Sequence, residues 1–257
     1  MELSDYSVLT FDCYGTLIDW ESGVWDAMQP LLQASGRDDV TRASALAAFA
    51  GIESAQQAQT PSLVYCQLLE RVHAQLADRF SLQSDAGMDR AFGASVPHWP
   101  AFPDTADALR ILKQHYKLVI VSNIDRAGFA ASNRKLGVAF DAVYTAQDIG
   151  SYKPDPRNFQ YMLGHLADDL GISPGDILHT AQSLFHDHAP ARDAGLARAW
   201  IDRHSIDLVL HGDDFSSEME ELCYKIPIEM GIYRSVGYTP GISTTDLIAR
   251  IRAAEVD

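Results

Sequence analysis

Short hydrophobic strands alternate with helical segments along the middle of the chain, and this alternation constrains the fold more than any other feature. Strand-like runs occupy residues 117–121, 142–145, 177–180 and 199–202. Helical patterns occupy residues 105–115, 128–136, 156–170 and 189–196. Such alternation is typical of a parallel sheet whose strands are joined by right-handed crossovers. Residues 8–11 have the β-branched and aromatic content of one more buried strand. The sequence therefore predicts an α/β fold with helices flanking a parallel sheet.

The segment between the first strand and the alternating region has helical patterning alone. From Trp20 to about Phe92 no strand pattern occurs, and an apolar stripe at helical spacing consists of Leu63, Leu68, Leu69, Val72 and Leu76. Residues 96–103 are rich in proline, which stops helices and indicates a domain boundary. We therefore expect a helical cap, residues 19–96, inserted into a core made of residues 1–18 and 97–257.

Beyond Arg203 the patterns weaken. Residues 208–210 are strand-like and residues 217–223 are helix-like. A closing helix over residues 245–254 is also expected, because Thr244 or Thr245 can cap its amino terminus.

Charge and cysteine usage exclude several classes of function. Thirty-five acidic side chains against twenty basic ones give a formal charge of −15, which repels nucleic acid and anionic membranes. The three cysteines are far apart and odd in number, which favours neither a disulfide framework nor a zinc site. No apolar run is long enough to span a bilayer, and the amino terminus lacks the pattern of a signal peptide. These features predict a cytoplasmic protein that binds neither nucleic acid nor membranes.

A single carboxylate, Asp12, follows the first strand and precedes a turn at Gly15. Ligands of parallel sheets bind at the carboxyl ends of the strands, and an aspartate placed there can act as a nucleophile through a covalent ester. Taken alone, the segment is equally consistent with an aspartate that only caps a turn.

Other strand ends also carry polar residues. Ser122 and Asn123 follow a strand and can hold a carboxylate or an oxyanion. Lys153 lies on a proline-rich loop, where its charge can offset the negative charge of an attacking carboxylate. Asp187 can orient water, pair with Lys153 or bind a cation with Asp12. The flanking histidines, His186 and His188, can make hydrogen bonds at a helix start, which we favour, or take part in catalysis, since histidine titrates near neutral pH.

The motifs around Asp12, Ser122–Asn123, Lys153 and Asp187 occur in the order found in the haloacid dehalogenase superfamily, which the chain resembles from about residue 8 to residue 203. This resemblance implies a Rossmann-like core, a helical cap over the active site and an aspartyl ester intermediate. It further implies that Thr16 and Lys153 steady Asp12, and that Asp187 with Lys153 positions the hydrolytic water. A small carboxylate substrate would be held by Ser122, Asn123 and nearby backbone amides, with Ser183 as a further substrate-binding residue.

The residue two positions after Asp12 separates the branches of this superfamily. Phosphatases usually have an aspartic acid there, whereas Tyr14 resembles the 2-haloacid dehalogenases, which need no metal ion. We therefore expect no cofactor and count Tyr14 among the substrate-binding residues. A phosphatase that binds Mg²⁺ through Asp12 and Asp187 is one alternative, and a member without catalytic activity is another.

Three positions depart from the dehalogenase pattern. Arg42 stands near the place of the arginine that cradles the halide but lacks its usual neighbours, Phe159 replaces a tyrosine and Ser183 replaces an asparagine. The motifs 11–21, 99–103, 122–126 and 151–154 instead resemble the branch of L-azetidine-2-carboxylate hydrolase, which opens a strained ring at C2. A cationic ring nitrogen suits an acidic or aromatic lining, with Trp20 and Glu53 as substrate-binding candidates and Trp99 and Phe102 as further aromatic candidates. The acidic surface and apolar cap are also compatible with a homodimer.

Overall fold

The computed structural model describes residues 3–203, 209–212, 228 and 233–236. The chain forms two compact units, Met1–Arg203 and His204–Asp257. Within the second unit, β6 (Val209–Gly212) and β7 (Tyr233–Val236) form a parallel pair, so β6 overlaps the predicted strand at residues 209 and 210. The predicted helices at residues 217–223 and 245–254 lie outside the described residues.

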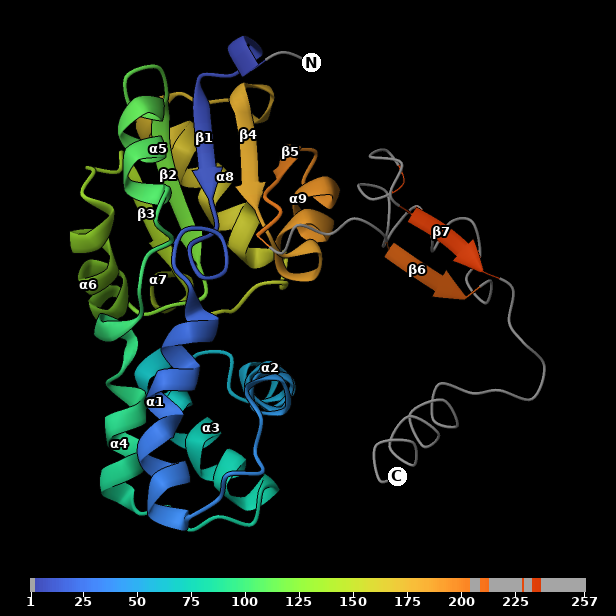
Figure 1. The fold of residues 1–257 in the computed structure, drawn as a ribbon. Coiled ribbons are helices and arrows are strands. Elements are labelled where there is room, and N and C mark those ends of the chain that lie inside the picture. Colours follow the sequence, from blue (N-terminus) through green and yellow to red (C-terminus); the bar gives the residue numbers. More distant parts are fainter. Residues whose placement is uncertain (1–2, 204–208, 213–227, 229–232, 237–257) are drawn as a thin grey trace. The chain divides into compact units, whose positions relative to one another are not determined.

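The first unit is built on a five-stranded sheet with the order β3-β2-β1-β4-β5, in which every pair is parallel. The strands are β1 (Val8–Phe11), β2 (Lys117–Ser122), β3 (Ala142–Thr145), β4 (Ile177–Ala181) and β5 (Ala197–Trp200). The first strand lies at the centre, between β2 and β4 (Figure 1). The predicted α/β fold with a parallel sheet is confirmed.

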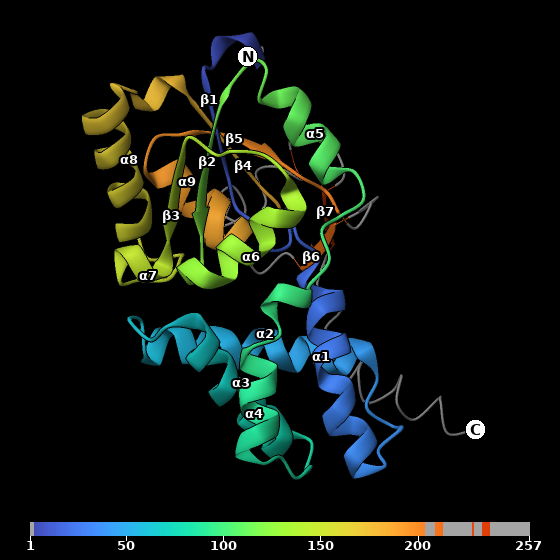
Figure 2. The same cartoon turned by 90° about the vertical axis from the view of Figure 1, so that its left-hand side faces the viewer.

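Helices cover both faces of this sheet. They are α5 (Thr105–Leu112), α6 (Arg126–Leu136), α7 (Ala146–Ile149), α8 (Arg157–Leu170) and α9 (Ala189–Asp193). Leu118 and Ile120 of β2 belong to the core cluster that includes α5 and α6, whereas Val119 and Val121 belong to the cluster with α8 and α9 (Figure 2). Because successive residues of a strand point to opposite faces, a strand buried on both sides is continuously apolar.

Three details differ from the expected elements. The helix α9 stops at Asp193, because Gly195 adopts a φ of +77° that ends the helical path. The strand β5 begins and ends two residues earlier than predicted, since its register pairs Leu178 with Ala197. The helix α7 was not expected, because a four-residue helix stabilised by a capping box at Thr145 leaves no periodic pattern.

The inserted segment forms four helices, namely α1 (Trp20–Ser35), α2 (Arg42–Gln59), α3 (Tyr65–Arg79) and α4 (Ala86–Gly93). They form a separate layer at the carboxyl ends of the strands, which confirms a helical cap inserted after β1 (Figures 1 and 2). Of the predicted stripe, Leu68, Leu69, Val72 and Leu76 on α3 are fully inaccessible, whereas Leu63 precedes α3 and is partly buried. In the described part of the chain, no helix is both long and apolar enough to cross a membrane.

The chain enters and leaves the cap through two adjacent segments. Ile18 forms an antiparallel bridge with Ala101, the amide of Asp19 donates to the carbonyl of Pro100 at 2.8 Å, and the amide of Phe102 donates to the carbonyl of Leu17 at 3.2 Å. The proline-rich stretch therefore returns the chain to the core beside its point of exit. This pairing fixes the cap at one end of the sheet, above the strand ends.

Candidate active site

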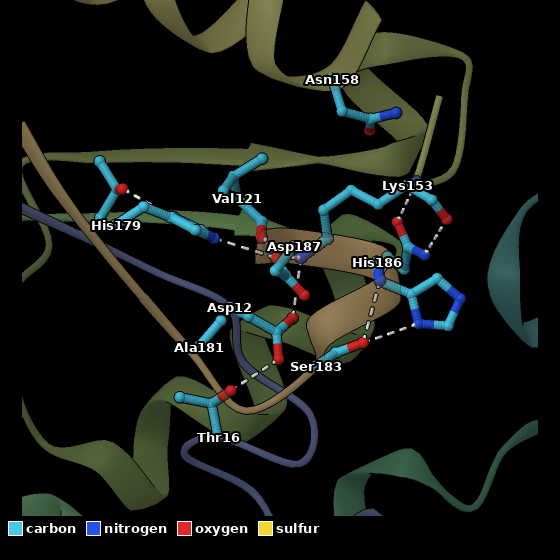
Figure 3. Close-up of polar contacts among 12 residues, drawn as sticks. Asp12, Thr16, Val121, Lys153, Asn158, His179, Ala181, Ser183, His186 and Asp187 are labelled. Atoms are coloured by element: carbon cyan, nitrogen blue, oxygen red, sulfur yellow. Dashed lines mark hydrogen bonds and ion pairs between the residues drawn. The ribbon is translucent and has the colours of Figure 1, made fainter. Parts of the chain in front are cut away.

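Asp12 lies directly after β1, in the turn that leads toward the cap. Thr16 Oγ1 donates to Asp12 Oδ2 at 2.8 Å, and Lys153 Nζ donates to Asp12 Oδ1 at 2.9 Å (Figure 3). The turn passes through Gly15 at a φ of +97°, a conformation that favours glycine. Thr16 also accepts a hydrogen bond from the amide of Gln182 at 3.1 Å, which ties this turn to the segment after β4. Both oxygens of the carboxylate are thus held by donors.

Lys153 joins the two acidic residues of the site. Its side chain is 1% exposed, and its ammonium donates to Asp12, to Asp187 Oδ1 at 2.6 Å and to the carbonyl of Val121 at 2.9 Å (Figure 3). Burial alone would lower the pKa of Lys153, but Asp12 and Asp187 outweigh that effect and raise it. Burial raises the pKa of Asp12, and the ammonium opposes this shift. Lys153 therefore carries a positive charge that stabilises the ionised form of Asp12.

Asp187 lies in a single π-helical turn, Leu184–His188, that follows β4. Its Oδ1 accepts hydrogen bonds from Lys153 and, at 3.1 Å, from Nε2 of His179. Its Oδ2 is buried without a hydrogen-bond partner. Although burial would raise the pKa of Asp187, Lys153 and His179 hold it below its ordinary value. Asp187 is therefore an ionised carboxylate with one uncommitted oxygen.

Ser122 and Asn123, at the end of β2, differ in what their side chains do. Ser122 Oγ is buried without a partner, so it is free to bind a ligand. The amide of Asn123 instead pairs with the backbone of Lys153: Lys153 N donates to Asn123 Oδ1 at 2.6 Å, and Asn123 Nδ2 donates to Lys153 O at 2.9 Å. Asn123 therefore orients the lysine loop.

These side chains line one cavity of about 200 Å³ between the core and the cap. The predicted residues in its wall are Asp12, Tyr14, Trp20, Glu53, Ser122, Asn123, Lys153, Ser183 and Asp187. Residues in the wall that sequence reasoning missed are Phe49, Ala50, Gln57, Tyr65 and Gln182. Phe49, Glu53 and Gln57 are four residues apart on α2, so their common helical face was a usable signal. Thr16 lies outside the wall and acts through Asp12.

The cap contributes an acidic and aromatic part of this wall. Tyr65 donates a hydrogen bond to Glu53 Oε1 at 2.6 Å, and burial raises the pKa of Glu53 to about 7. Trp20 stacks on Phe49 with ring centroids 5.5 Å apart. Glu53 therefore changes its charge near neutral pH, in contact with a cavity whose cap side is otherwise largely aromatic.

Tyr14 occupies the position where a phosphatase would carry its acid. Its hydroxyl lies 2.9 Å from Ser132 Oγ, and burial raises the pKa of the phenol well above its ordinary value. Its ring packs edge-on against Trp99 at 5.6 Å. The phenol is therefore neutral at physiological pH.

The two histidines near Asp187 have different surroundings. His186 lines the cavity, its amide donates to Ser183 Oγ at 3.0 Å, and burial lowers the pKa of its imidazole. His188 lies outside the wall, where its Nε2 is 2.9 Å from the carbonyl of Ala181 and burial lowers its pKa to about 4. Ser183 thus caps the turn that carries Asp187, as expected of a helix start.

Four other residues considered from the sequence lie outside this wall. Arg42 is bound at the surface by Ser22, whose Oγ lies 3.2 Å from Nη2. Phe159 packs beneath the site against His179, with ring centroids 5.0 Å apart. Trp99 is buried and donates to Ser95, and Phe102 lies under the guanidinium of Arg203. Lys153 is thus the one Lys or Arg side chain in the wall among the described residues.

A family model described as haloacid dehalogenase-like hydrolase matches residues 6–181. The chain belongs to the haloacid dehalogenase-like hydrolases. This confirms the resemblance and the hydrolase class predicted from the ordered motifs around Asp12, Lys153 and Asp187. The resemblance to the azetidine branch stays a prediction.

Curated relatives of this haloacid dehalogenase-like hydrolase include two dehalogenases. It is 28% identical over 186 residues to (S)-2-haloacid dehalogenase 4A of Burkholderia cepacia, covering 68% of this chain and 74% of that protein. It is 25% identical over 214 residues to (S)-2-haloacid dehalogenase of Pseudomonas putida, covering 77% of this chain and 85% of that protein. The solved L-2-haloacid dehalogenase from Xanthobacter autotrophicus has the same fold, with a TM-score of 0.65 at 21% identity over 84% of this chain and 82% of that chain.

Proposed function

We propose that this hydrolase displaces a leaving group from C2 of a small 2-substituted carboxylate through an ester formed on Asp12. The observation that carries the proposal is the carboxylate of Asp12, held by Thr16 and Lys153 in the wall of a cavity of about 200 Å³. A cavity of this size suits a small substrate. A solved Xanthobacter autotrophicus structure, with a TM-score of 0.65, contains chloropropionic acid covalently bound, and this supports the proposal.

The reaction proceeds in two displacements. In the first, an oxygen of Asp12 bonds to C2 while the bond from C2 to the leaving group breaks. In the second, water attacks Cγ of Asp12, and the bond between Cγ and the ester oxygen breaks to release a 2-hydroxy acid. Asp187 Oδ2 takes the proton of the water, and this proton passes to the departing oxygen. Lys153 offsets the negative charge that develops on Asp12 in the second step.

The substrate carboxylate binds at Ser122. Its Oγ is buried and uncommitted in the free enzyme, so the substrate satisfies an otherwise unpaired polar group. Asn123 lies beside it in the wall, but both polar atoms of its amide are engaged by Lys153. Asn123 therefore contributes to binding chiefly through the position of the lysine loop.

Two leaving groups remain distinct candidates. The dehalogenase relatives favour halide. The wall favours a strained cyclic amine, as in L-azetidine-2-carboxylate, because Glu53 and the rings of Trp20, Phe49 and Tyr65 suit a cationic nitrogen. Arg42 is bound by Ser22 outside the wall, and the ammonium of Lys153, which is in the wall, is paired with Asp12 and Asp187.

A substrate panel separates these candidates. Both enantiomers of 2-chloropropionate, L-azetidine-2-carboxylate and a phosphate ester are assayed with and without Mg²⁺. We expect turnover of a carboxylate substrate without added Mg²⁺. Hydrolysis of the phosphate ester alone, dependent on Mg²⁺, would instead support the phosphatase alternative through Asp12 and Asp187.

The ester mechanism has its own test. A single turnover in heavy-oxygen water should place unlabelled oxygen in the product, because the product oxygen comes from Asp12. Asp12→Asn should lose turnover and keep the unfolding transition of the wild type. Label in the first product, or full activity of Asp12→Asn, would contradict the mechanism.

A further inference from the structure

A chain of buried hydrogen bonds reaches Asp187 from the side opposite the cavity. Thr10 of β1 and His179 of β4 are register partners in the sheet, and Thr10 Oγ1 lies 2.9 Å from Nδ1 of His179. The other ring nitrogen of His179 lies 3.1 Å from Asp187 Oδ1 (Figure 3). Thr10 and His179 are completely buried, and neither lines the cavity. The hydrogen bonds from Thr10 through His179 to Asp187 therefore lie within the buried sheet and not in the cavity wall.

The partners of His179 determine which nitrogen carries the proton. A carboxylate oxygen can only accept, so Nε2 must donate to Asp187. The hydroxyl of Thr10 can donate, and its donation to Nδ1 satisfies a neutral ring with a bare Nδ1. The opposite tautomer would place the lone pair of Nε2 against the ionised oxygen of Asp187. The network therefore places a proton on Nε2 of His179.

His179 acts on only one of the two carboxylates. Asp187 Oδ1 is filled by His179 and Lys153, which leaves Oδ2 unpartnered. His179 makes no side-chain hydrogen bond to Asp12, whose oxygens accept from Thr16 and Lys153. Without His179, Asp187 would retain Lys153 alone on Oδ1, and its plane would no longer be fixed. Lys153 would still keep its bonds to Asp12 and to the carbonyl of Val121.

We propose that His179, oriented by Thr10, is a positioning residue that aims Asp187 Oδ2 at the water that hydrolyses the Asp12 ester. This inference rests on the proposed function and deepens it by assigning His179 to the second half-reaction alone. The proton balance is that of the ester mechanism, because His179 keeps its proton throughout. Formation of the ester does not require His179.

The two half-reactions are measured separately in a single turnover. Ester formation is followed as chloride release from 2-chloropropionate or as ring opening of L-azetidine-2-carboxylate, and intact-protein mass spectrometry reports the ester that has not yet been hydrolysed. In His179→Phe, which keeps a ring against Phe159, we expect ester formation within about threefold of the wild-type rate. Hydrolysis should be slower by about tenfold, the effect of one lost hydrogen bond to a charged group, so the ester accumulates. His179→Gln, which retains an N–H donor, should recover part of this rate.

The matched control is His165→Phe. His165 lies on α8, where its Nδ1 is 2.9 Å from the carbonyl of Tyr161, outside the cavity wall. This control should hydrolyse the ester at the wild-type rate. If the wild type forms an Asp12 ester and His179→Phe hydrolyses it equally fast, or slows both half-reactions equally, the inference is wrong while the proposed function stands. A wild type that forms no ester on Asp12 refutes both.

A second measurement uses the free enzyme and no substrate. Nitrogen NMR of the imidazole rings should show that Nε2 of His179 carries a proton. Thr10→Val removes the donor to Nδ1 and should shift the Nδ1 resonance of His179, with slower ester hydrolysis in the same variant. An Nδ1–H tautomer in the wild type would overturn the proposed orientation of Asp187.

Discussion

The ionisation of Glu53 should give opposite pH profiles for the two classes of substrate. Its pKa is raised to about 7 by burial, so it is protonated below that pH and negatively charged above it. A substrate with an ammonium leaving group needs the negatively charged form of Glu53. Its kcat/KM should therefore fall about tenfold for each pH unit below 7. A 2-haloacid is anionic, so its kcat/KM should instead decline as Glu53 ionises.

Tyr65→Phe should raise the pKa of Glu53, and with it the midpoint of the pH profile of kcat/KM. The hydroxyl of Tyr65 donates to Glu53 at 2.6 Å and lowers the pKa of the carboxyl. A hydrogen bond to a charged group is worth roughly 1.5 kcal/mol, and 1.36 kcal/mol corresponds to about one pKa unit. The midpoint should therefore rise from about 7 to roughly 8. At pH 7 the charged fraction drops from about one half to about one tenth, so kcat/KM for the amine falls about fivefold.

The assay compares kcat/KM across pH for L-azetidine-2-carboxylate and 2-chloropropionate with the wild type and three variants. Glu53→Gln should remove the inflection for both substrates. Tyr161→Phe is the matched control, because Tyr161 packs on His165 outside the wall and should leave the midpoint unchanged. An inflection that survives in Glu53→Gln, or a midpoint that moves down in Tyr65→Phe, would refute this reasoning.

Two further substitutions test the site, and a third tests how the cap is held on the core. Lys153→Met leaves two buried carboxylates without their shared cation, so activity should be lost and stability should fall by about 3–5 kcal/mol at pH 7. Because the unpaired carboxylates bind protons more readily when folded, urea unfolding should show this deficit shrinking as the pH is lowered. Ser122→Ala should raise KM by about tenfold with little change in kcat, measured by steady-state kinetics. Asp125 caps α6, because its Oδ1 accepts from the amide of Gly128 at 2.7 Å, and its Oδ2 accepts from the amide of Cys66 in the helical cap at 3.0 Å. Asp125→Ala removes both hydrogen bonds. It should cost about 1–2 kcal/mol in urea unfolding, and an unchanged midpoint would contradict the role of this bond.

The core of the fold could be predicted because a parallel sheet leaves strong local signals. Each buried strand is an apolar run between helical segments, and β1 and β3 have the expected bounds. The end of α9 and the register of β5 depend on pairing with β4 and on the conformation of Gly195, which are tertiary properties. A four-residue helix such as α7 is too short for periodicity to reveal.

In the candidate site, too, residues with a local sequence signal could be predicted and residues that depend on tertiary contacts could not. Asp12, Lys153 and Asp187 could be named from the sequence because the strand ends of a parallel sheet converge at one edge. His179 could not, since a histidine inside a buried strand resembles any core residue until its partners are known. Tyr65 was missed because its place in the wall depends on how the cap docks against the core, whereas Phe49 and Gln57 share a helical face with Glu53 and could have been found from that spacing.

The loop that carries Lys153 connects the chemistry of the core to the selectivity of the cap. Its backbone is held by Asn123, and the hydroxyl of the preceding residue, Tyr152, donates to the carbonyl of Leu63 in the cap. The same loop therefore places the shared ammonium and anchors the turn between α2 and α3. Because Glu53 lies on α2, a displacement of the cap would move Glu53 relative to Asp12. If the proposed function holds, selection of the leaving group and activation of Asp12 both depend on how the cap docks on the core.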